Sequence, residues 1–237
     1  MNNYDLLSDA YEKTHEKPDK KFSMLPTALS ILNPLKNKIV IDVGCGDGFF
    51  TKEFSKEAKS VIGIDNSKEQ ILKSRKNSGP NIKYLLADMN EYNYSGSDII
   101  FAPFVLNYLE SSDNLQKLFN KFYKGLSPNG MIAGIMDFPK KLVHDSKKFG
   151  IIKKIKKLED GEKMDIELYN EEKHLVTLHS FYHTKKTVEK LLKNSGFANI
   201  VWHKSIVSEK GKKIMGQEFW KGYVEDCDLE YFTASKL

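Results

Sequence analysis

A glycine-rich turn is the strongest chemical signal in this 237-residue chain. The segment Val40-Ile41-Asp42-Val43-Gly44-Cys45-Gly46-Asp47-Gly48-Phe49-Phe50 reads as a buried strand, a sharp turn and the start of a helix. Glycines let the main chain turn tightly and let a ligand lie against it, and the helix N-terminus adds free N–H donors and the positive end of a dipole. A turn that binds nothing is the alternative, but three glycines at alternate positions after an acid-bearing strand favour a ligand-binding loop.

The spacing of these glycines separates two kinds of nucleotide site. A nicotinamide site requires Gly-x-Gly-x-x-Gly, and here the third glycine comes one residue too early. The pattern acid-x-Gly-x-Gly-x-Gly instead resembles the signature loop of class I S-adenosyl-L-methionine (SAM)-dependent methyltransferases. The resemblance implies SAM as the cofactor and a loop of cofactor-binding residues consisting of Asp42, Gly44, Cys45, Gly46 and Gly48.

The ends of the next predicted strands extend this resemblance. Asp65, about twenty residues beyond the loop, can accept hydrogen bonds from both ribose hydroxyls, with Asn66 beside it, although a helix N-cap is the simpler role for an Asp there. Asp88 and Met89 match the adenine site of the family, where the carboxylate accepts from the amino group and the Met89 N–H donates to the ring. An Asp after a strand is otherwise a common turn residue.

The segment 101–109 follows the fourth predicted strand, and in the family it lines the methionine part of the cofactor and faces the acceptor. Pro103 and Phe104 are therefore predicted cofactor contacts, and Asn107 is a candidate catalytic residue. The N-terminal segment 4–11 resembles the opening Tyr-Asp…Tyr helix of small-molecule methyltransferases, which makes Tyr11 a candidate for both cofactor binding and catalysis; a core aromatic is its alternative role. His183 is the third catalytic candidate, and His144 and His179 are further candidate bases, although a lone His is more often structural.

Two absences favour a small-molecule acceptor. The segment 102–105, Ala-Pro-Phe-Val, lacks the Asp/Asn-Pro-Pro-aromatic element that holds a flipped base, and neither Cys45 nor Cys227 is expected where a carbon-5 pyrimidine methylase needs its nucleophile. The C-terminal half resembles N- and O-methyltransferases of secondary metabolites such as toxoflavin, through Phe181-Tyr182, Ser195-Gly196-Phe197, Val201-Trp202-His203 and the run from Gly216 to Tyr223. An RNA methyltransferase and a non-catalytic SAM-binding or partner-binding protein remain alternatives.

The elements that must position these residues alternate along the chain. Strands are predicted at 39–43, 61–64, 82–86, 99–102 and 131–136, with helices at 49–59, 67–77 and 113–125 between them, which is typical of a doubly wound α/β fold. We expect a single Rossmann-like domain with a seven-stranded sheet. It comprises an N-terminal helical lid (1–37), a SAM-binding core (38–137), an inserted cap (138–183) and a C-terminal helix with closing strands (184–237).

Within the cap, the lysine-rich segment 140–157 has apolar residues at helical spacing and is predicted to be a helix with a solvated or anion-attracting face. A two-stranded hairpin is predicted to follow at 164–169 and 174–181. The final helix is expected at 184–194.

The composition and charge of the chain restrict its expected location and binding partners. Hydrophobic residues make up 40% and charged residues 29% of the chain, and the net charge of +5 comes almost entirely from lysine. Bidentate phosphate contacts favour arginine, which is scarce in this chain. The mild basicity therefore indicates a solvated surface more than a nucleic-acid site. With two separated cysteines, no metal-ligand spacing, no secretory signal and no membrane-spanning run, we expect a cytoplasmic monomer or homodimer that binds no metal, membrane or nucleic acid.

Overall fold

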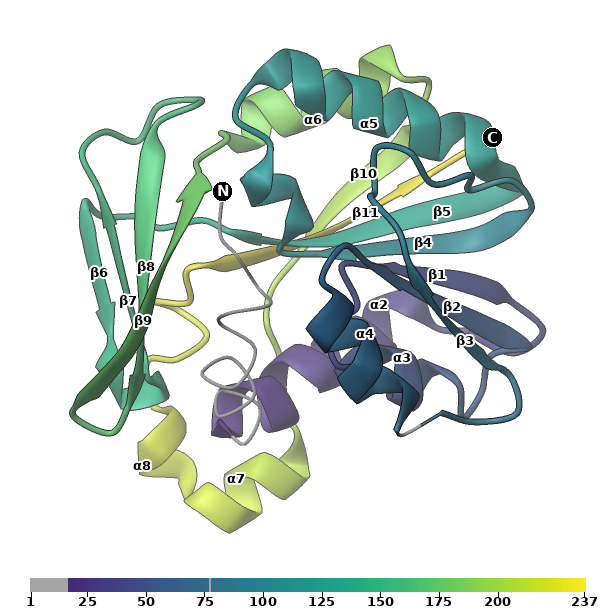
Figure 1. Ribbon diagram of the computed structural model, residues 1–237. Helices are drawn as coiled ribbons and strands as arrows, with labels where there is room; N and C mark the ends of the chain where they lie inside the picture. Colours follow the sequence, from purple (N-terminus) through teal and green to yellow (C-terminus); the bar gives the residue numbers. More distant parts are fainter. Residues whose placement is uncertain (1–16, 77) are drawn as a thin grey trace.

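The computed structural model describes residues 17–76 and 78–237, and its centre is a twisted seven-stranded sheet (Figure 1). The strand order is β10-β11-β5-β4-β1-β2-β3. The strands β1 (Ile39–Val43), β2 (Ser60–Asp65), β3 (Ile82–Leu86), β4 (Ser97–Pro103) and β5 (Leu126–Asp137) are mutually parallel, whereas β11 (Leu229–Ser235) is antiparallel to β5 and to β10 (Ala198–His203).

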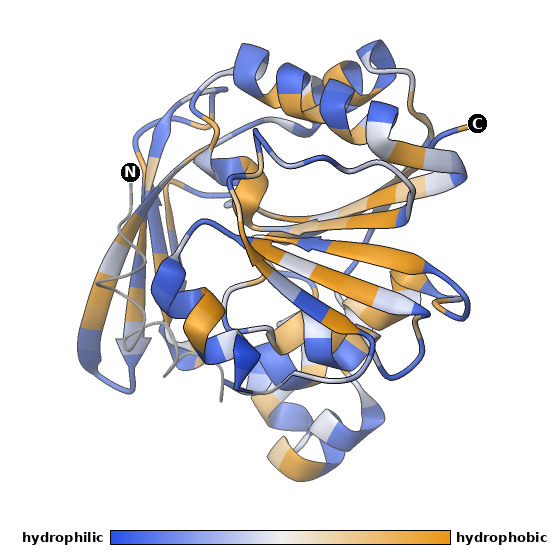
Figure 2. Ribbon diagram, turned by 45° about the vertical axis from the view of Figure 1, so that its right-hand side comes forward, coloured by the Kyte–Doolittle hydropathy of each residue, from blue (hydrophilic) through white to orange (hydrophobic). Residues whose placement is uncertain are grey.

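Helices cover both faces of this sheet. The helices α2 (Leu25–Leu32) and α3 (Phe49–Phe54) pack on one face, and α5 (Ser112–Gly125) and α6 (Lys185–Asn194) pack on the other. The helix α4 (Lys68–Arg75) lies against β2 and β3. Figure 2 shows the apolar strands between helices whose outer sides are hydrophilic. The predicted doubly wound α/β fold with seven strands is confirmed, and its parallel strands are apolar on both sides because both sides are covered.

A second sheet occupies the chain between β5 and α6. Its four antiparallel strands have the order β6-β7-β8-β9, with bounds Val143–Ser146, Ile151–Ile155, Lys163–Asn170 and Lys173–Phe181. The 3-10 turn η3 (Lys147–Phe149) joins the first two strands. The β8–β9 hairpin has the predicted position, and the whole sheet stands beside the seven-stranded sheet in Figure 1.

The helix predicted at 140–157 is wrong, because this segment forms β6, η3 and β7. Pairing with β8 gives β7 a period of two, so Lys153 and Ile155 are buried while Lys154 between them is exposed. The helical spacing of the apolar residues was coincidental, and Leu142, one of them, is 52% exposed. Strand pairing overrode the local pattern, as it does where β-branched residues such as Ile151 and Ile152 can pack on a sheet.

Shorter elements complete the fold. The chain enters through a π-helical turn η1 (Lys20–Met24) that continues into α2, and a 3-10 turn η2 (Val105–Tyr108) follows β4. The helices α7 (Glu209–Met215) and α8 (Gln217–Trp220) connect β10 to β11 and pack beside η1. In the part of the chain that the structure describes, no helix combines the length and apolar character that crossing a bilayer requires.

Candidate active site

A first cavity lies at the carboxyl ends of β1, β2, β3 and β4, and encloses about 160 Å³. This is the place where the strand order reverses between β4 and β1, which is where open α/β sheets bind ligands. Eight of the predicted cofactor residues line it: Gly44, Gly46, Asp65, Asn66, Asp88, Met89, Pro103 and Phe104. Four separate strand ends thus bring together side chains that are up to sixty residues apart in the sequence.

Glycine is required at the three loop positions for different structural reasons. All have positive φ, at 68°, 56° and 89° for Gly44, Gly46 and Gly48, a region that disfavours any side chain. A Cβ on Gly44 would lie 2.2 Å from Val105, and a Cβ on Gly48 would lie 2.2 Å from the Tyr84 hydroxyl, so these two glycines make room for protein. A Cβ on Gly46 would meet no atom closer than 3.8 Å, and Gly46 lines the first cavity. The bare main chain at Gly46 therefore fits a ligand that lies against the loop.

Asp65 joins the loop to the next helix. Its Oδ2 accepts a hydrogen bond from the Gly46 N–H at 2.9 Å, and its Oδ1 accepts one from the Ser67 N–H at 2.8 Å. The N-cap of α4 is Ser67, whose hydroxyl accepts from the Gln70 N–H at 3.2 Å. The Asp65 carboxylate, which lines the first cavity, thus connects the glycine loop to the start of α4.

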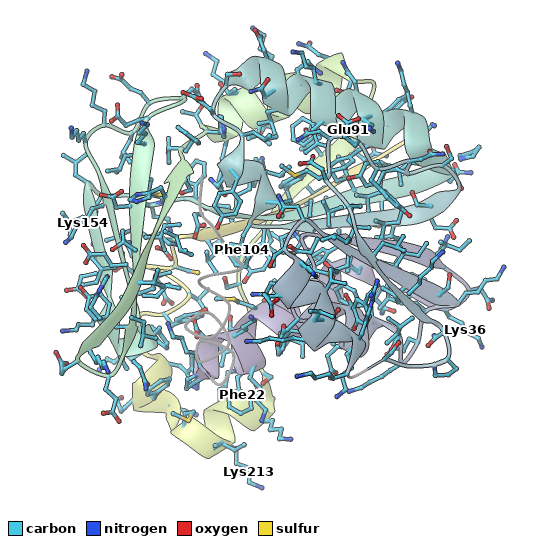
Figure 3. The ribbon with its side chains drawn as sticks, viewed as in Figure 1. Phe22, Lys36, Glu91, Phe104, Lys154 and Lys213 are labelled. Carbon is cyan, nitrogen blue, oxygen red and sulfur yellow. The ribbon has the colours of Figure 1, made fainter. Side chains whose placement is uncertain are left out.

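Residues at the ends of β3 and β4 form the other walls. Asp88 is exposed, and its Oδ1 accepts from the backbone and side-chain nitrogens of Asn90 at 2.7 and 3.0 Å. Phe104 has a positive φ of 62° and donates its N–H to the Ile135 carbonyl at 2.7 Å. That conformation turns the chain out of β4 and sets the Phe104 ring at the centre of the molecule, between the two sheets (Figure 3).

Asp42, Cys45 and Gly48 do not line the first cavity. Asp42 is fully buried behind the loop, where its Oδ2 accepts from the Thr51 hydroxyl at 2.6 Å and its Oδ1 has no hydrogen-bond partner among the described residues. Burial raises the pKa of Asp42 to about 7. Burial also raises the pKa of the Cys45 thiol, which is therefore neutral. These residues shape the loop from behind.

The three predicted catalytic residues have different surroundings. His183 is fully buried, its Nε2 lies 2.7 Å from the Leu109 carbonyl, and burial lowers its pKa. Asn107 is also buried, and its side chain donates to the carbonyls of Asp137 (3.2 Å) and Phe181 (3.0 Å) and accepts from the Asp137 N–H (2.9 Å). Neither side chain lines the first cavity or the hollows that adjoin it. Tyr11 lies outside the described residues.

The other two candidate bases also have local partners. The buried His144 Nε2 lies 2.9 Å from the Ser146 hydroxyl and 3.7 Å from Asp228. His179 is exposed on β9, with Nδ1 2.8 Å from Asp165. His179 lines an outer groove near the first cavity, and His144 lines none of the cavities.

A second cavity of about 330 Å³ adjoins the first, and Phe104 and Tyr108 line both. Its walls come from the chain before η1, from the four-stranded sheet and from the segment between α8 and β11. Much of the wall is apolar, including Met24, Phe149, Ile151, Ile166, Leu168 and Leu178. Five lysines and five aspartates also line it: Lys17, Lys20, Lys148, Lys153, Lys221, Asp19, Asp137, Asp145, Asp226 and Asp228.

One buried ion cluster fixes the two sheets together at this cavity. Lys153 of β7 is fully buried, and its Nζ lies 2.6 Å from Asp137, the last residue of β5, and 2.7 Å from Asp228, which precedes β11. Burial alone would lower the pKa of Lys153, but the two carboxylates outweigh it and raise the pKa. Lys153 is thus a cation at neutral pH, and it links the inserted sheet to two strands of the central sheet.

Sequence reasoning missed this cavity almost entirely. Cys227, which sequence reasoning considers only as a pyrimidine-methylase nucleophile, is buried on the wall of the second cavity, with Sγ 3.2 Å from the Ser205 hydroxyl. The strand period of two at 151–155 could have indicated an inward-facing Lys153. No local pattern could have shown that Asp19, Asp137 and Asp228 line one cavity.

Comparisons with known proteins agree with this geometry. Residues 40–130 match the family model described as "Methyltransferase domain". The chain is 31% identical over 134 residues to phosphoethanolamine N-methyltransferase 1 of Triticum aestivum. The aligned region covers 54% of this chain and 26% of that protein. It is 29% identical over 171 residues to the carboxy-S-adenosyl-L-methionine synthase of Nautilia profundicola, covering 68% of this chain and 70% of that one.

Among solved structures, a SAM-dependent methyltransferase of Clostridium acetobutylicum superposes with a TM-score of 0.66 at 19% identity, covering 99% of both chains. That likeness shows the fold. The chain spans about a quarter of the length of the wheat relative. The match over residues 40–130 is to a methyltransferase domain, and the fold of the whole chain is that of SAM-dependent methyltransferases.

Proposed function

We propose that this protein transfers the methyl group of SAM to an oxygen or nitrogen atom of a small-molecule acceptor. The observation that carries the proposal is the pair of adjoining cavities that share Phe104 and Tyr108. The first offers bare main chain and acidic side chains at four strand ends, and the second is larger and mostly apolar. Two reactants held in such neighbouring cavities would meet at the shared aromatic wall.

Each part of the cofactor has matching residues in the first cavity. Asp65, with Asn66, would accept the ribose hydroxyls, while Asp88 and the Met89 N–H would hold the adenine. Gly44 and Gly46 would lie under the sugar and the methionine part, with Pro103 and Phe104 beside its sulfonium end. Asp42, Cys45 and Gly48 would support the loop from behind, and Asn107 and His183 would hold the acceptor side of the site in shape through their backbone partners.

The bound cofactor supplies an electrophilic methyl group, so the protein's main task is to position the acceptor. Holding the attacking atom about 3 Å from the methyl carbon and in line with the C–S bond converts a bimolecular encounter into an intramolecular one. Phe104 and Tyr108 would set this distance and exclude water from the reacting atoms. A base is needed only if the acceptor atom is protonated when it attacks.

A small acceptor is supported by the size of the second cavity and by the names of the relatives, which include enzymes for phosphoethanolamine and for carboxy-SAM. The scarcity of arginine argues against a polynucleotide acceptor. We place the protein in the cytoplasm as a monomer or homodimer that needs no metal.

Calorimetric titration with S-adenosylhomocysteine tests the cofactor site. We expect Asp65→Ala to weaken binding at least tenfold, and Ser67→Ala, which removes the side-chain cap of α4, to leave it within about threefold. Because Asp65 also holds the Gly46 N–H, the 2′,3′-dideoxy form of the ligand separates the two roles. If Asp65 binds ribose, wild type prefers the hydroxylated ligand and Asp65→Ala does not. An unchanged preference in the variant would refute the ribose assignment.

The acceptor class is tested by incubating the protein with methyl-labelled SAM and a fractionated metabolite extract, with and without ribonuclease. Label in a low-molecular-weight fraction that survives ribonuclease is the expected result. Label that disappears with ribonuclease would identify an RNA methyltransferase. Cofactor binding without transfer to any fraction would indicate a non-catalytic SAM-binding protein.

A further inference from the structure

One carboxylate on the wall of the second cavity differs from its neighbours. Of the five aspartates there, Asp137 and Asp228 share Lys153, Asp145 accepts the Lys147 N–H at 2.9 Å, and Asp226 pairs with Lys141 at 3.3 Å. The Asp19 carboxylate accepts from the backbone N–H groups of Asp19 and Lys20, but its buried Oδ1 has no hydrogen-bond partner among residues 17–76 and 78–237. An unmade hydrogen bond at a buried polar atom costs about 1–3 kcal/mol, so a ligand that satisfies it gains affinity.

Asp19 is positioned where an acceptor would have to bind. It precedes the π-helical turn η1, is 6% exposed, and lines the second cavity together with Phe104 and Tyr108, the residues shared with the first cavity. The next residue, Lys20, places its Nζ 4.8 Å from the ring of Phe49, directly after the glycine loop. The turn η1 therefore lies between the glycine loop and the second cavity, and Asp19 at its start lines that cavity.

The charged surroundings set the protonation of Asp19. Burial raises its pKa to about 6, and the neighbouring Lys17 and Lys20 limit the rise. Tyr223 and Tyr231, from the elements packed against this segment, and Cys227 are all neutral at that pH, since burial raises the pKa of each. At pH 7 and above Asp19 is an anion that only accepts hydrogen bonds, and its partner must be an N–H or O–H donor.

We propose that Asp19 anchors the acceptor through an N–H or O–H group, and that the acceptor is a compact amine or alcohol with an apolar body. This rests on the proposed function. The cavity lining carries five cations and five anions, so it has no excess of positive charge to favour an anionic acceptor. An apolar cavity of about 150 Å³ holds one benzene, so about 330 Å³ accommodates a molecule of roughly two rings or an equivalent chain.

The same carboxylate can take the proton that the reaction releases. As the acceptor atom forms its bond to the methyl carbon, the C–S bond breaks and its electron pair stays on sulfur, giving S-adenosylhomocysteine. The proton of the acceptor N–H or O–H moves to the Asp19 carboxylate and then to solvent. A carboxylate whose pKa lies near 6 serves this step better than an exposed one, because a general base is most effective when its pKa lies close to the working pH.

Binding of three probes of one shape to the S-adenosylhomocysteine complex tests the anchor: 2-phenylethylamine, 2-phenylethanol and 3-phenylpropanoate. We expect wild type to prefer the amine to the carboxylate by at least tenfold at pH 8, with the alcohol between them. Asp19→Asn should remove this preference while keeping its affinity for S-adenosylhomocysteine. The matched controls Asp145→Asn and Asp226→Asn change aspartates of the same cavity that already have partners, and they should keep the preference.

The pH dependence gives a second readout. The wild-type preference for the amine should fall as the pH drops below about 6, where Asp19 becomes protonated, and Asp19→Asn should show no such change. Thermal unfolding of each variant checks that it is folded. An amine preference that persists in Asp19→Asn, or a wild-type complex that binds no amine, would overturn the anchor. Failure of wild type to bind S-adenosylhomocysteine would overturn the proposed function instead.

Discussion

Replacing Lys153 by Met tests whether the buried ion cluster holds the inserted sheet to the central one. Met is unbranched and one heavy atom shorter than Lys, and the substitution leaves Asp137 and Asp228 without their shared cation. At separations of 2.6 and 2.7 Å each pair contributes a gross attraction of about 6 kcal/mol at an effective dielectric constant of about 20. Desolvation of the ammonium offsets several kcal/mol of this, so we expect the variant to lose about 3–5 kcal/mol of unfolding free energy.

For a chain of this size that loss corresponds to a fall in Tm of about 6–20 °C, measurable by calorimetry or urea titration. The matched control is Lys154→Met on the same strand. Lys154 is 48% exposed, pairs with Glu167 at 2.5 Å and lies on the outer side of the four-stranded sheet (Figure 3), so this change should cost less than about 1 kcal/mol. Equal losses in the two variants would refute the reasoning.

The pH dependence of the Lys153→Met variant gives an independent check. Burial already raises the pKa of Asp137 in the presence of Lys153, and removal of that cation raises it further. A carboxylate whose folded pKa lies above its unfolded value of about 3.9 loses stability as the pH rises through the folded pKa. The stability gap between wild type and variant should therefore be larger at pH 8 than at pH 5.

Three further perturbations test the first cavity and its surroundings. Gly46→Ala should lower the affinity for S-adenosylhomocysteine at least tenfold and lower Tm by only a few degrees, whereas Gly48→Ala, which drives a Cβ into Tyr84, should lower Tm more and affinity less. Calorimetry that gives the reverse order would contradict our account of the loop. Wild-type stability should carry a component that declines from pH 4 to 7 as buried Asp42 ionises, and Asp42→Asn should abolish it in urea titrations at a series of pH values; a variant with the wild-type pH profile would refute the assignment. Burial lowers the pKa of His183, so the contribution of its neutral imidazole to the free energy of unfolding should be lost as the pH falls below about 6.5, and His183→Gln should show no such loss. The same urea titrations measure this loss, and a variant with the wild-type pH profile would count against a neutral buried imidazole.

The first cavity was largely predictable because its chemistry is local. The glycine loop, Asp65 and Asp88 each stand at or just after the end of a predicted strand, and parallel strands end at one edge of their sheet, so residues at successive strand ends must gather there. Positions behind the loop were harder to separate from positions that face the cavity. Asp42 and Gly48 lie in the same motif as Gly46, yet only the packing of Thr51 and Tyr84 shows that they face the protein.

The sequence by itself determined the doubly wound fold, the strand ends that meet in the first cavity and the residue types suited to an adenosyl ligand. Hydrophobic periodicity and glycine spacing act over a few residues and are written directly in the chain. Only the tertiary structure decided that 140–157 forms strands, that Lys153 lies between Asp137 and Asp228, and that Asp19 is left with an unpartnered oxygen beside the second cavity. These features depend on pairing and burial between segments up to about two hundred residues apart, and no local pattern encodes which charges will meet away from water.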